Sequence, residues 1–398
     1  MTTEAVQARP KKARLVTPLF LLVSLSTFAY FVSVGTLQPT LPRFVEGPLG
    51  GGSVAVGVAV GAFSISAVIV RPLAGRISDT HGRRPLIVWG AASVGLATAG
   101  HLVVTELWLL LLLRVVYGVG EAFFFTAAAG VVNDLAPDER RGEAVSYFSL
   151  ALYGGLVLGP VLGEIVLGDG HYNRAWILAA ATAALAAVLG LPVPDTRPDE
   201  ESIPPQGLRR FVHPAALLPG TVLATSMWGL GGYFTFVPLY ALELGLSGSR
   251  GIFATFSGII LAIRGFGARI PDRLGPRRSA RAALTLQACG LLVMALWQNP
   301  VGLYAGTVVF AVGQALSFPA LMTIAIDGAP ASERGAVVGT FTAFFDLAFG
   351  LGAVSLGAVV AVAGYAGSFA GGALVAGLGL LLMFTRARRA RRAPPHGS

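Results

Sequence analysis

Residues 71–84 read RPLAGRISDTHGRR, and residues 264–277 read RGFGARIPDRLGPR, at an offset of 193 positions. Among the identical residues that this offset pairs are Arg71 with Arg264, Asp79 with Asp272, Gly82 with Gly275, and Arg84 with Arg277. A second pair of stretches keeps the offset, since DLAPDERRG at 134–142 corresponds to DGAPASERG at 327–335. One unchanged offset from residue 71 to residue 142 indicates that the chain contains an internal duplication.

The composition restricts the class of protein. The chain has 398 residues, of which 54% are hydrophobic and 12% charged, so a soluble globular domain is excluded. The net charge of +9 comes from short Lys and Arg clusters between long apolar runs, a pattern that fits anionic lipid headgroups and not nucleic acid. Cys289 is the only cysteine, which excludes a disulfide framework or a Cys-ligated metal site within one chain.

The apolar runs predict an all-α membrane protein with twelve transmembrane helices in two pseudo-symmetric six-helix bundles, because about 20 apolar residues cross a bilayer. Of the 29 Lys and Arg residues, 23 fall in the two tails, in the even-numbered loops or at their edges, which places both termini in the cytoplasm. The predicted domains are a first bundle at 1–191, a cytoplasmic linker at 192–215, a second bundle at 216–385 and a basic tail at 386–398. The expected spans are 15–38, 54–74, 86–105, 107–132, 143–167, 174–191, 216–242, 251–270, 282–298, 301–326, 336–361 and 364–385.

Two motifs resemble those of a known family. The loop from Gly75 to Arg84 resembles the signature G-x-L-A-D-R-x-G-R-K of the major facilitator superfamily. This resemblance implies a cytoplasmic gate loop, formed by Gly75, Asp79, Gly82, Arg83 and Arg84 with Asp272 and Arg277 of the second copy. In the segment 143–167, Gly155, Gly159, Pro160 and Gly163 resemble the motif G-x3-G-P-x2-G-G of the 12-helix drug:proton antiporters. Glu164 replaces the last glycine of that motif and is expected to be solvated or to lie at the mouth near an external end.

Three ionisable residues fall deep inside predicted spans: Arg114, Glu121 and Asp346. A charged carboxylate is costly at the bilayer centre, so Glu121 and Asp346 are proton-coupling candidates, with Arg114 as a partner. Two structural alternatives stay open, namely that Glu121 pairs statically with Arg114 and that Asp346 caps a kink or meets a hydroxyl. Arg71 and Arg264 fall near cytoplasmic ends and are expected to extend toward the interface or to brace the gate loop.

The repeat also predicts where substrate binds. The offset pairs Glu121 with Gln314 and Asp346 with Tyr153, and such sites lie between the two halves near the bilayer midplane. Aromatic residues concentrate on the helices expected around the cavity, which suits an amphipathic or aromatic substrate. The predicted cavity residues are Tyr30, Tyr153, Trp228, Tyr233, Phe234, Gln314 and Phe345.

The sequence predicts a multi-pass transporter of the cell membrane and not an enzyme. It is expected to act as a monomer, without metal or cofactor, and to use the proton gradient to export drugs or secreted metabolites. One alternative is a proton-symporting importer of a nutrient or organic ion in the same fold. A second is an intramembrane enzyme or lipid flippase-like factor, although the motifs H-E-x-x-H and G-x-S-x-G do not occur.

Overall fold

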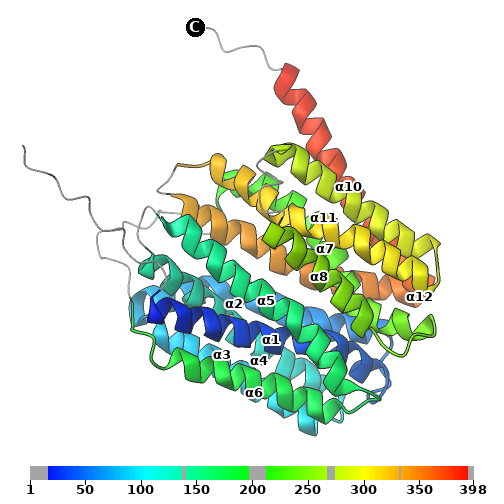
Figure 1. Ribbon diagram of the computed structural model, residues 1–398, viewed down its shortest axis with the longest axis horizontal. Helices are drawn as coiled ribbons and strands as arrows, with labels where there is room; N and C mark the ends of the chain where they lie inside the picture. Colours follow the sequence, from blue (N-terminus) through cyan, green and yellow to red (C-terminus); the bar gives the residue numbers. More distant parts are fainter. Residues whose placement is uncertain (1–16, 137–139, 197–211, 267–273, 331–332, 393–398) are drawn as a thin grey trace, which may run out of the picture.

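The fold is seen in a computed structural model, which describes residues 17–136, 140–196, 212–266, 274–330 and 333–392 (Figure 1). Within these ranges the regular structure is entirely helical. The helices are α1 Pro18–Glu46, α2 Ser53–His81, α3 Arg84–Gly100, a short 3-10 helix η1 His101–Val103, α4 Leu107–Leu135, α5 Arg141–Leu167, α6 Tyr172–Gly190, α7 Pro214–Glu243, α8 Arg250–Phe266, α10 Pro276–Leu296, α11 Pro300–Asp327 and α12 Arg334–Arg392.

Ten helices in the described ranges are long and apolar enough to cross a membrane. Of the others, α8 is apolar but has 17 residues. The long α12 is broken at Gly364, whose φ of 67° and ψ of −177° are non-helical. A residue with a Cβ rarely adopts this backbone conformation, so the glycine permits the break between the expected spans 336–361 and 364–385. The count of twelve treats α8 and both parts of α12 as spans, and it stays a prediction.

Helix starts follow from local chemistry. Thr17 caps α1, where its Oγ1 accepts a hydrogen bond from the Phe20 amide at 3.2 Å. Asn299 caps α11 in the same way, accepting from the Gly302 amide at 2.9 Å. In both helices a proline follows the cap directly, where its missing N–H costs nothing.

The helices pack as two groups. In the first group, α1 contacts α5 and α6, α2 contacts α4, and α3 contacts α4 and α6. In the second group, α10 contacts α11 and α12, while α7 contacts α11 and α12. Contacts of α2 with α12, of α5 with α8 and of α1 with α7 join the first group (α1 to α6) to the second (α7 to α12), and α5 lies beside α8 in Figure 1. This packing favours the predicted division of the chain at 192–215, which itself stays a prediction.

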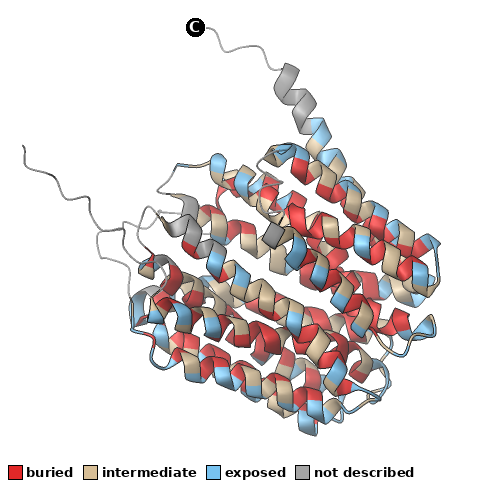
Figure 2. Ribbon diagram, viewed as in Figure 1, coloured by how far each residue is buried: buried red, intermediate tan, exposed pale blue. Residues whose placement is uncertain are grey.

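Exposed residues lie along the outer faces of the helices (Figure 2), and many of them are large and apolar. Trp89, Leu96 and Val362 are 71%, 74% and 85% exposed. A water-soluble protein rarely exposes such extended apolar surface, whereas a lipid-facing surface is expected to be apolar. The outer faces of the helices therefore suit a bilayer.

The glycines of the motif in 143–167 form the contact between α5 and α1. A Cβ added to Gly159 would lie 2.7 Å from the Gly35 Cα, and one added to Gly155 or Gly163 would lie 2.6 Å from a carbonyl oxygen of α1. Pro160 belongs to the same contact, because its ring lies against Gly35. These residues therefore hold two helices of the first group at close backbone approach.

Candidate substrate and proton site

Arg71 of α2 connects two carboxylates from different helix groups. Its Nη2 lies 3.3 Å from Oε2 of Glu121 on α4, and its Nη1 contacts Oδ2 of Asp346 on α12. The side chains of Arg71, Glu121 and Asp346 are 14%, 10% and 18% exposed, so they are largely but not fully buried. We call these three residues the Arg71 cluster. The expectation that Arg71 extends toward the membrane interface was wrong, because its guanidinium turns to these two acids.

Arg114 does not pair with Glu121, so the proposed static pair is not formed. Its Nε instead donates to the Ala59 carbonyl of α2 at 2.9 Å, and its guanidinium lies 4.7 Å from the ring centres of both Phe63 and Tyr117. Only 3% of Arg114 is exposed. This arginine therefore holds α4 against α2, while Glu121 stays available to Arg71.

The charges of the Arg71 cluster do not cancel. One guanidinium faces two carboxylates, so the cluster carries a net charge of −1 when both acids are ionised. An uncompensated buried charge is costly, and a single proton or a cationic group placed beside the acids would remove it. The arrangement can thus bind a proton or a cation reversibly.

The repeat-related arginine also reaches across the two groups. The Arg264 guanidinium of α8 lies 3.5 Å from the ring centre of Tyr153 on α5. At the offset of 193, Arg264 corresponds to Arg71 and Tyr153 to Asp346. The duplication therefore places an arginine contact at each of two interfaces between the groups, one with a carboxylate and the other with an aromatic ring.

Gln314, the repeat counterpart of Glu121, faces its own helix group. Its Oε1 accepts a hydrogen bond from Ser226 at 3.1 Å and another from Gln287. With 6% of its surface exposed, Gln314 stabilises the packing of α11 with α7 and α10 in this conformation.

The predicted cavity aromatics divide into two sets. Tyr30 and Tyr233 are fully buried, Tyr30 stacking on Phe124 with ring centres 4.0 Å apart, and Phe234 is nearly so. In this conformation these three side chains belong to the packed core. The other predicted residues, Tyr153, Trp228 and Phe345, are partly exposed. The predicted cavity aromatics that stay accessible in this conformation therefore lie on α5, α7 and α12.

The gate loop after α2 is held by an ion pair that the sequence analysis did not identify. Arg83 is 8% exposed, and its Nη1 lies 2.7 Å from Oδ2 of Asp134 at the end of α4. The recurrence of Asp134 as Asp327 in the repeat was the signal for this partner. Arg84 is exposed, and its amide donates to Asp195 at 3.3 Å.

The turns themselves recur in both copies. Gly82 and Gly275 have φ angles of 90° and 79°, which only glycine adopts readily. Gly75 lies within α2, and a Cβ there would meet nothing within 4 Å. Asp272 and the side chain of Asp79 lie outside the described part of the structure, so their place in the gate stays a prediction.

A family model described as Major Facilitator Superfamily matches residues 23–348 and 252–398. The chain belongs to the Major Facilitator Superfamily. It is 27% identical over 381 residues to the uncharacterized MFS-type transporter YhhS of Escherichia coli K12, covering 93% of this chain and 92% of the relative. It is 29% identical over 382 residues to the uncharacterized MFS-type transporter PA14_38730 of Pseudomonas aeruginosa, covering 93% of each.

Solved structures share the fold at low sequence identity. The human organic anion transporter MFSD10 superposes with a TM-score of 0.73 at 19% identity, covering 92% of this chain and all of that one. A POT family transporter in complex with 5-aminolevulinic acid gives a TM-score of 0.77 at 13% identity, covering 93% and 96%. As a Major Facilitator Superfamily protein, the chain is a multi-pass membrane transporter of small molecules, not an enzyme, and needs no cofactor. No cluster of metal-ligating side chains occurs in the described ranges.

In this transporter the predicted external end is closed by contacts between the two groups. Glu164 at the end of α5 accepts hydrogen bonds from the Ser249 amide at 2.7 Å and the Ser249 hydroxyl at 3.2 Å, just before α8. Arg43 of α1 pairs with the same carboxylate at 3.2 Å. Of the two expectations for Glu164, solvation was wrong, because the residue is 7% exposed, and its place at the mouth stays a prediction. Tyr365 of α12 adds a second link by donating to Glu46 of α1 at 3.0 Å.

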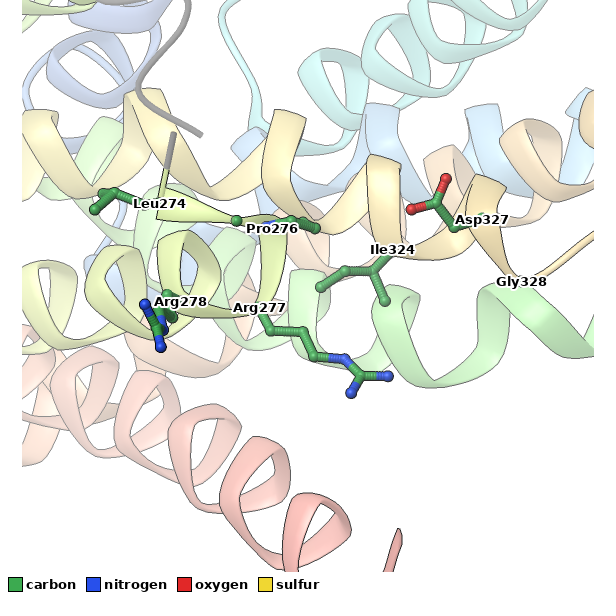
Figure 3. Close-up of a pocket in the computed structure, with 8 residues that line it drawn as sticks. Leu274, Pro276, Arg277, Arg278, Ile324, Asp327 and Gly328 are labelled. Carbon is green, nitrogen blue, oxygen red and sulfur yellow. The ribbon is translucent and has the colours of Figure 1, made fainter. Parts of the chain in front are cut away.

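The transporter also has a pocket at the second copy of the gate loop (Figure 3). It lies between the start of α10 and the end of α11, and its lining includes Arg277, Arg278, Ile324 and Asp327. Arg277, a predicted gate residue, is exposed there. No residue of the Arg71 cluster lines this pocket, so it is separate from the central site.

Proposed function

We propose that this transporter exports hydrophobic or amphipathic small molecules across the cell membrane in exchange for protons, with Glu121 and Asp346 as the proton acceptors. The observation that carries this proposal is the contact of Arg71 with both acids, because Asp346 belongs to the other helix group. A link between two groups that move against each other is broken or remade during alternating access.

Protonation of Asp346 can weaken this link between the two helix groups. When Asp346 is ionised, Arg71 and Asp346 attract each other across the interface between α2 and α12. A proton on Asp346 removes that attraction, while Glu121 retains Arg71 within the first group. A ligand shifts a conformational equilibrium only through a difference in affinity for the two states, and here the difference lies in one ion pair across the interface.

The net charge of the cluster supports exchange. With both acids ionised, the site favours one additional positive charge, which either a proton or a cationic group of the substrate can supply. Two ligands that neutralise the same excess charge exclude each other, and mutual exclusion is the requirement for antiport.

The helix motif supports export as the direction, and the closed external end is the state in which an exporter loads substrate and an importer releases it. Contacts of Glu164 with Ser249 and of Tyr365 with Glu46 close the predicted external side, so substrate would load from the predicted cytoplasmic side. The glycines in α5 resemble an antiporter motif. We therefore favour the antiporter among the alternatives, acting as a monomer with both termini in the cytoplasm.

The test measures gradient-driven transport in the full chain reconstituted into liposomes. Enclosed pyranine reports proton movement when ethidium or alanyl-phenylalanine is added under an imposed pH gradient. Glu121→Gln and Asp346→Asn should each abolish gradient-driven movement, whereas Glu106→Gln, an exposed acid at the start of α4, should leave it unchanged. Gradient-driven transport that persists in both cluster variants would remove these acids from the mechanism. Comparing right-side-out with everted cell vesicles then gives the direction.

A further inference from the structure

Arg264 is the repeat counterpart of Arg71 but lacks the acids that Arg71 contacts. Arg71 touches Glu121 and Asp346, whereas the only contact that the described residues give the Arg264 guanidinium is the ring of Tyr153. Its Nε is buried and has no hydrogen-bond partner in these ranges. A guanidinium is permanently charged and seeks a planar acceptor such as a carboxylate.

The divergence of the two copies explains the missing acids. Asp346 is replaced by Tyr153, which contacts Arg264 with its ring face. Glu121 is replaced by Gln314, whose amide is engaged by Ser226 and Gln287. In the first copy a carboxylate at the corresponding place touches the arginine, so the fold has room for a carboxylate next to Arg264 if Tyr153 moves aside.

The accessible charges at the two interfaces between the groups are therefore opposite in sign, which is complementary to a dipolar molecule. The Arg71 cluster has a net charge of −1, and Arg264 supplies +1 at the other interface between the groups. Arg114 does not enter this balance, because it is 3% exposed and donates to backbone carbonyls of α2.

We propose that Arg264 binds a carboxylate of the transported substrate and that this substrate is a small zwitterion whose amine faces Glu121 and Asp346. Partly exposed aromatic side chains lie near both ends, since Phe125 is 5.4 Å from the Arg71 guanidinium and Tyr153 lies under Arg264. They would contact an apolar body between the two charges. This assignment rests on the proposed function, and it narrows the substrate class from amphipathic molecules to those with both an amine and a carboxylate.

The first experiment measures binding to the full chain in nanodiscs without a pH gradient. Three matched sets of probes are compared: phenylalanine, alanyl-phenylalanine and 5-aminopentanoic acid, each with its carboxamide and its N-acetyl form. At least one zwitterion should bind about tenfold more tightly than both of its singly charged analogues, as expected when one well-made ionic contact is lost. If no zwitterion binds more tightly than its carboxamide and its N-acetyl form, the proposal is wrong.

The second experiment changes the protein. Arg264→Gln should weaken binding of the zwitterion to the level of its carboxamide while leaving carboxamide binding unchanged. Tyr153→Asp keeps the arginine but rebuilds the internal acid of the first copy, and it should have the same effect. Tyr147→Phe, at an exposed position of the same helix, is the control and should bind like the unmodified protein, with melting temperatures confirming that each variant is folded.

Equal loss of zwitterion and carboxamide binding in both Arg264→Gln and Tyr153→Asp would overturn the assignment. The outcome is independent of proton coupling, because binding without a gradient does not require Glu121 or Asp346 to exchange protons. A failure of the proton-coupling test with intact zwitterion preference would reject the antiport mechanism alone.

Discussion

The contact between Glu164 and Ser249 is expected to stabilise the conformation in which the external end is closed relative to the one in which it is open. Ser249 gives the Glu164 carboxylate two hydrogen bonds that cross between the helix groups, at 2.7 Å from its amide and 3.2 Å from its hydroxyl. Arg43 pairs with Glu164 inside the first group, so that pair survives when the groups separate. Of the contacts that Glu164 makes, only the two bonds to Ser249 are therefore lost when the external end opens.

The magnitude follows from the kind of bond. A hydrogen bond to a charged group contributes about 1.5 to 3 kcal/mol, and one between neutral groups about 1 kcal/mol. Glu164→Gln replaces charged acceptors by a neutral one and should cost the closed state about 1 to 2 kcal/mol, which is roughly a tenfold change in population. Ser249→Ala removes only the hydroxyl bond and should cause a smaller shift in the same direction.

Distances between spin labels measure this equilibrium directly. Cys289 is the only cysteine, so Cys289→Ser gives a background for labels introduced by Asp169→Cys and Ser247→Cys, both at exposed loop positions of the predicted external end. Glu164→Gln should increase the population with long distances, with Ser249→Ala intermediate. A distance distribution that is the same in all three proteins would refute the view that these bonds hold the end closed.

Three further predictions concern other contacts. Arg114→Gln should lower the melting temperature by several degrees, because the variant loses the hydrogen bond that the buried guanidinium donates to a backbone carbonyl of α2. An unchanged melting temperature would contradict that role. Gly159→Val should destabilise the α1–α5 contact by about 1 to 3 kcal/mol, and detergent-solubilised protein should lose its monodisperse peak on size exclusion. Arg83→Gln and Asp134→Asn should slow transport by similar factors, and the double variant should be no slower than either single one if the pair acts as a unit.

The sequence identifies the residues that recur in both copies, but it does not show which residues of one helix group contact residues of the other. The offset of 193 is enough to identify the arginines, the gate glycines and the divergent positions 153 and 314. The contact of Arg71 with Asp346 cannot be read from the chain, because the two residues are 275 positions apart and their helices belong to different groups. The burial of Glu164 was missed for the same reason, since its main partner, Ser249, lies in the other group.

The two interfaces between the groups carry different chemistry although they descend from one duplicated segment. A strictly symmetric pair would place an arginine and an acid at each interface, and a proton would then affect both equally. Here protonation acts on the contact between α2 and α12, because the contact between α5 and α8 pairs Arg264 with an aromatic ring and not with a carboxylate. In the proposed mechanism a proton therefore loosens the interface between α2 and α12 and leaves the charge at the interface between α5 and α8 unchanged. In the proposed mechanism the loss of the acids from the second copy separates the two tasks of an antiporter, with proton binding at the acids beside Arg71 and recognition of the substrate anion at Arg264.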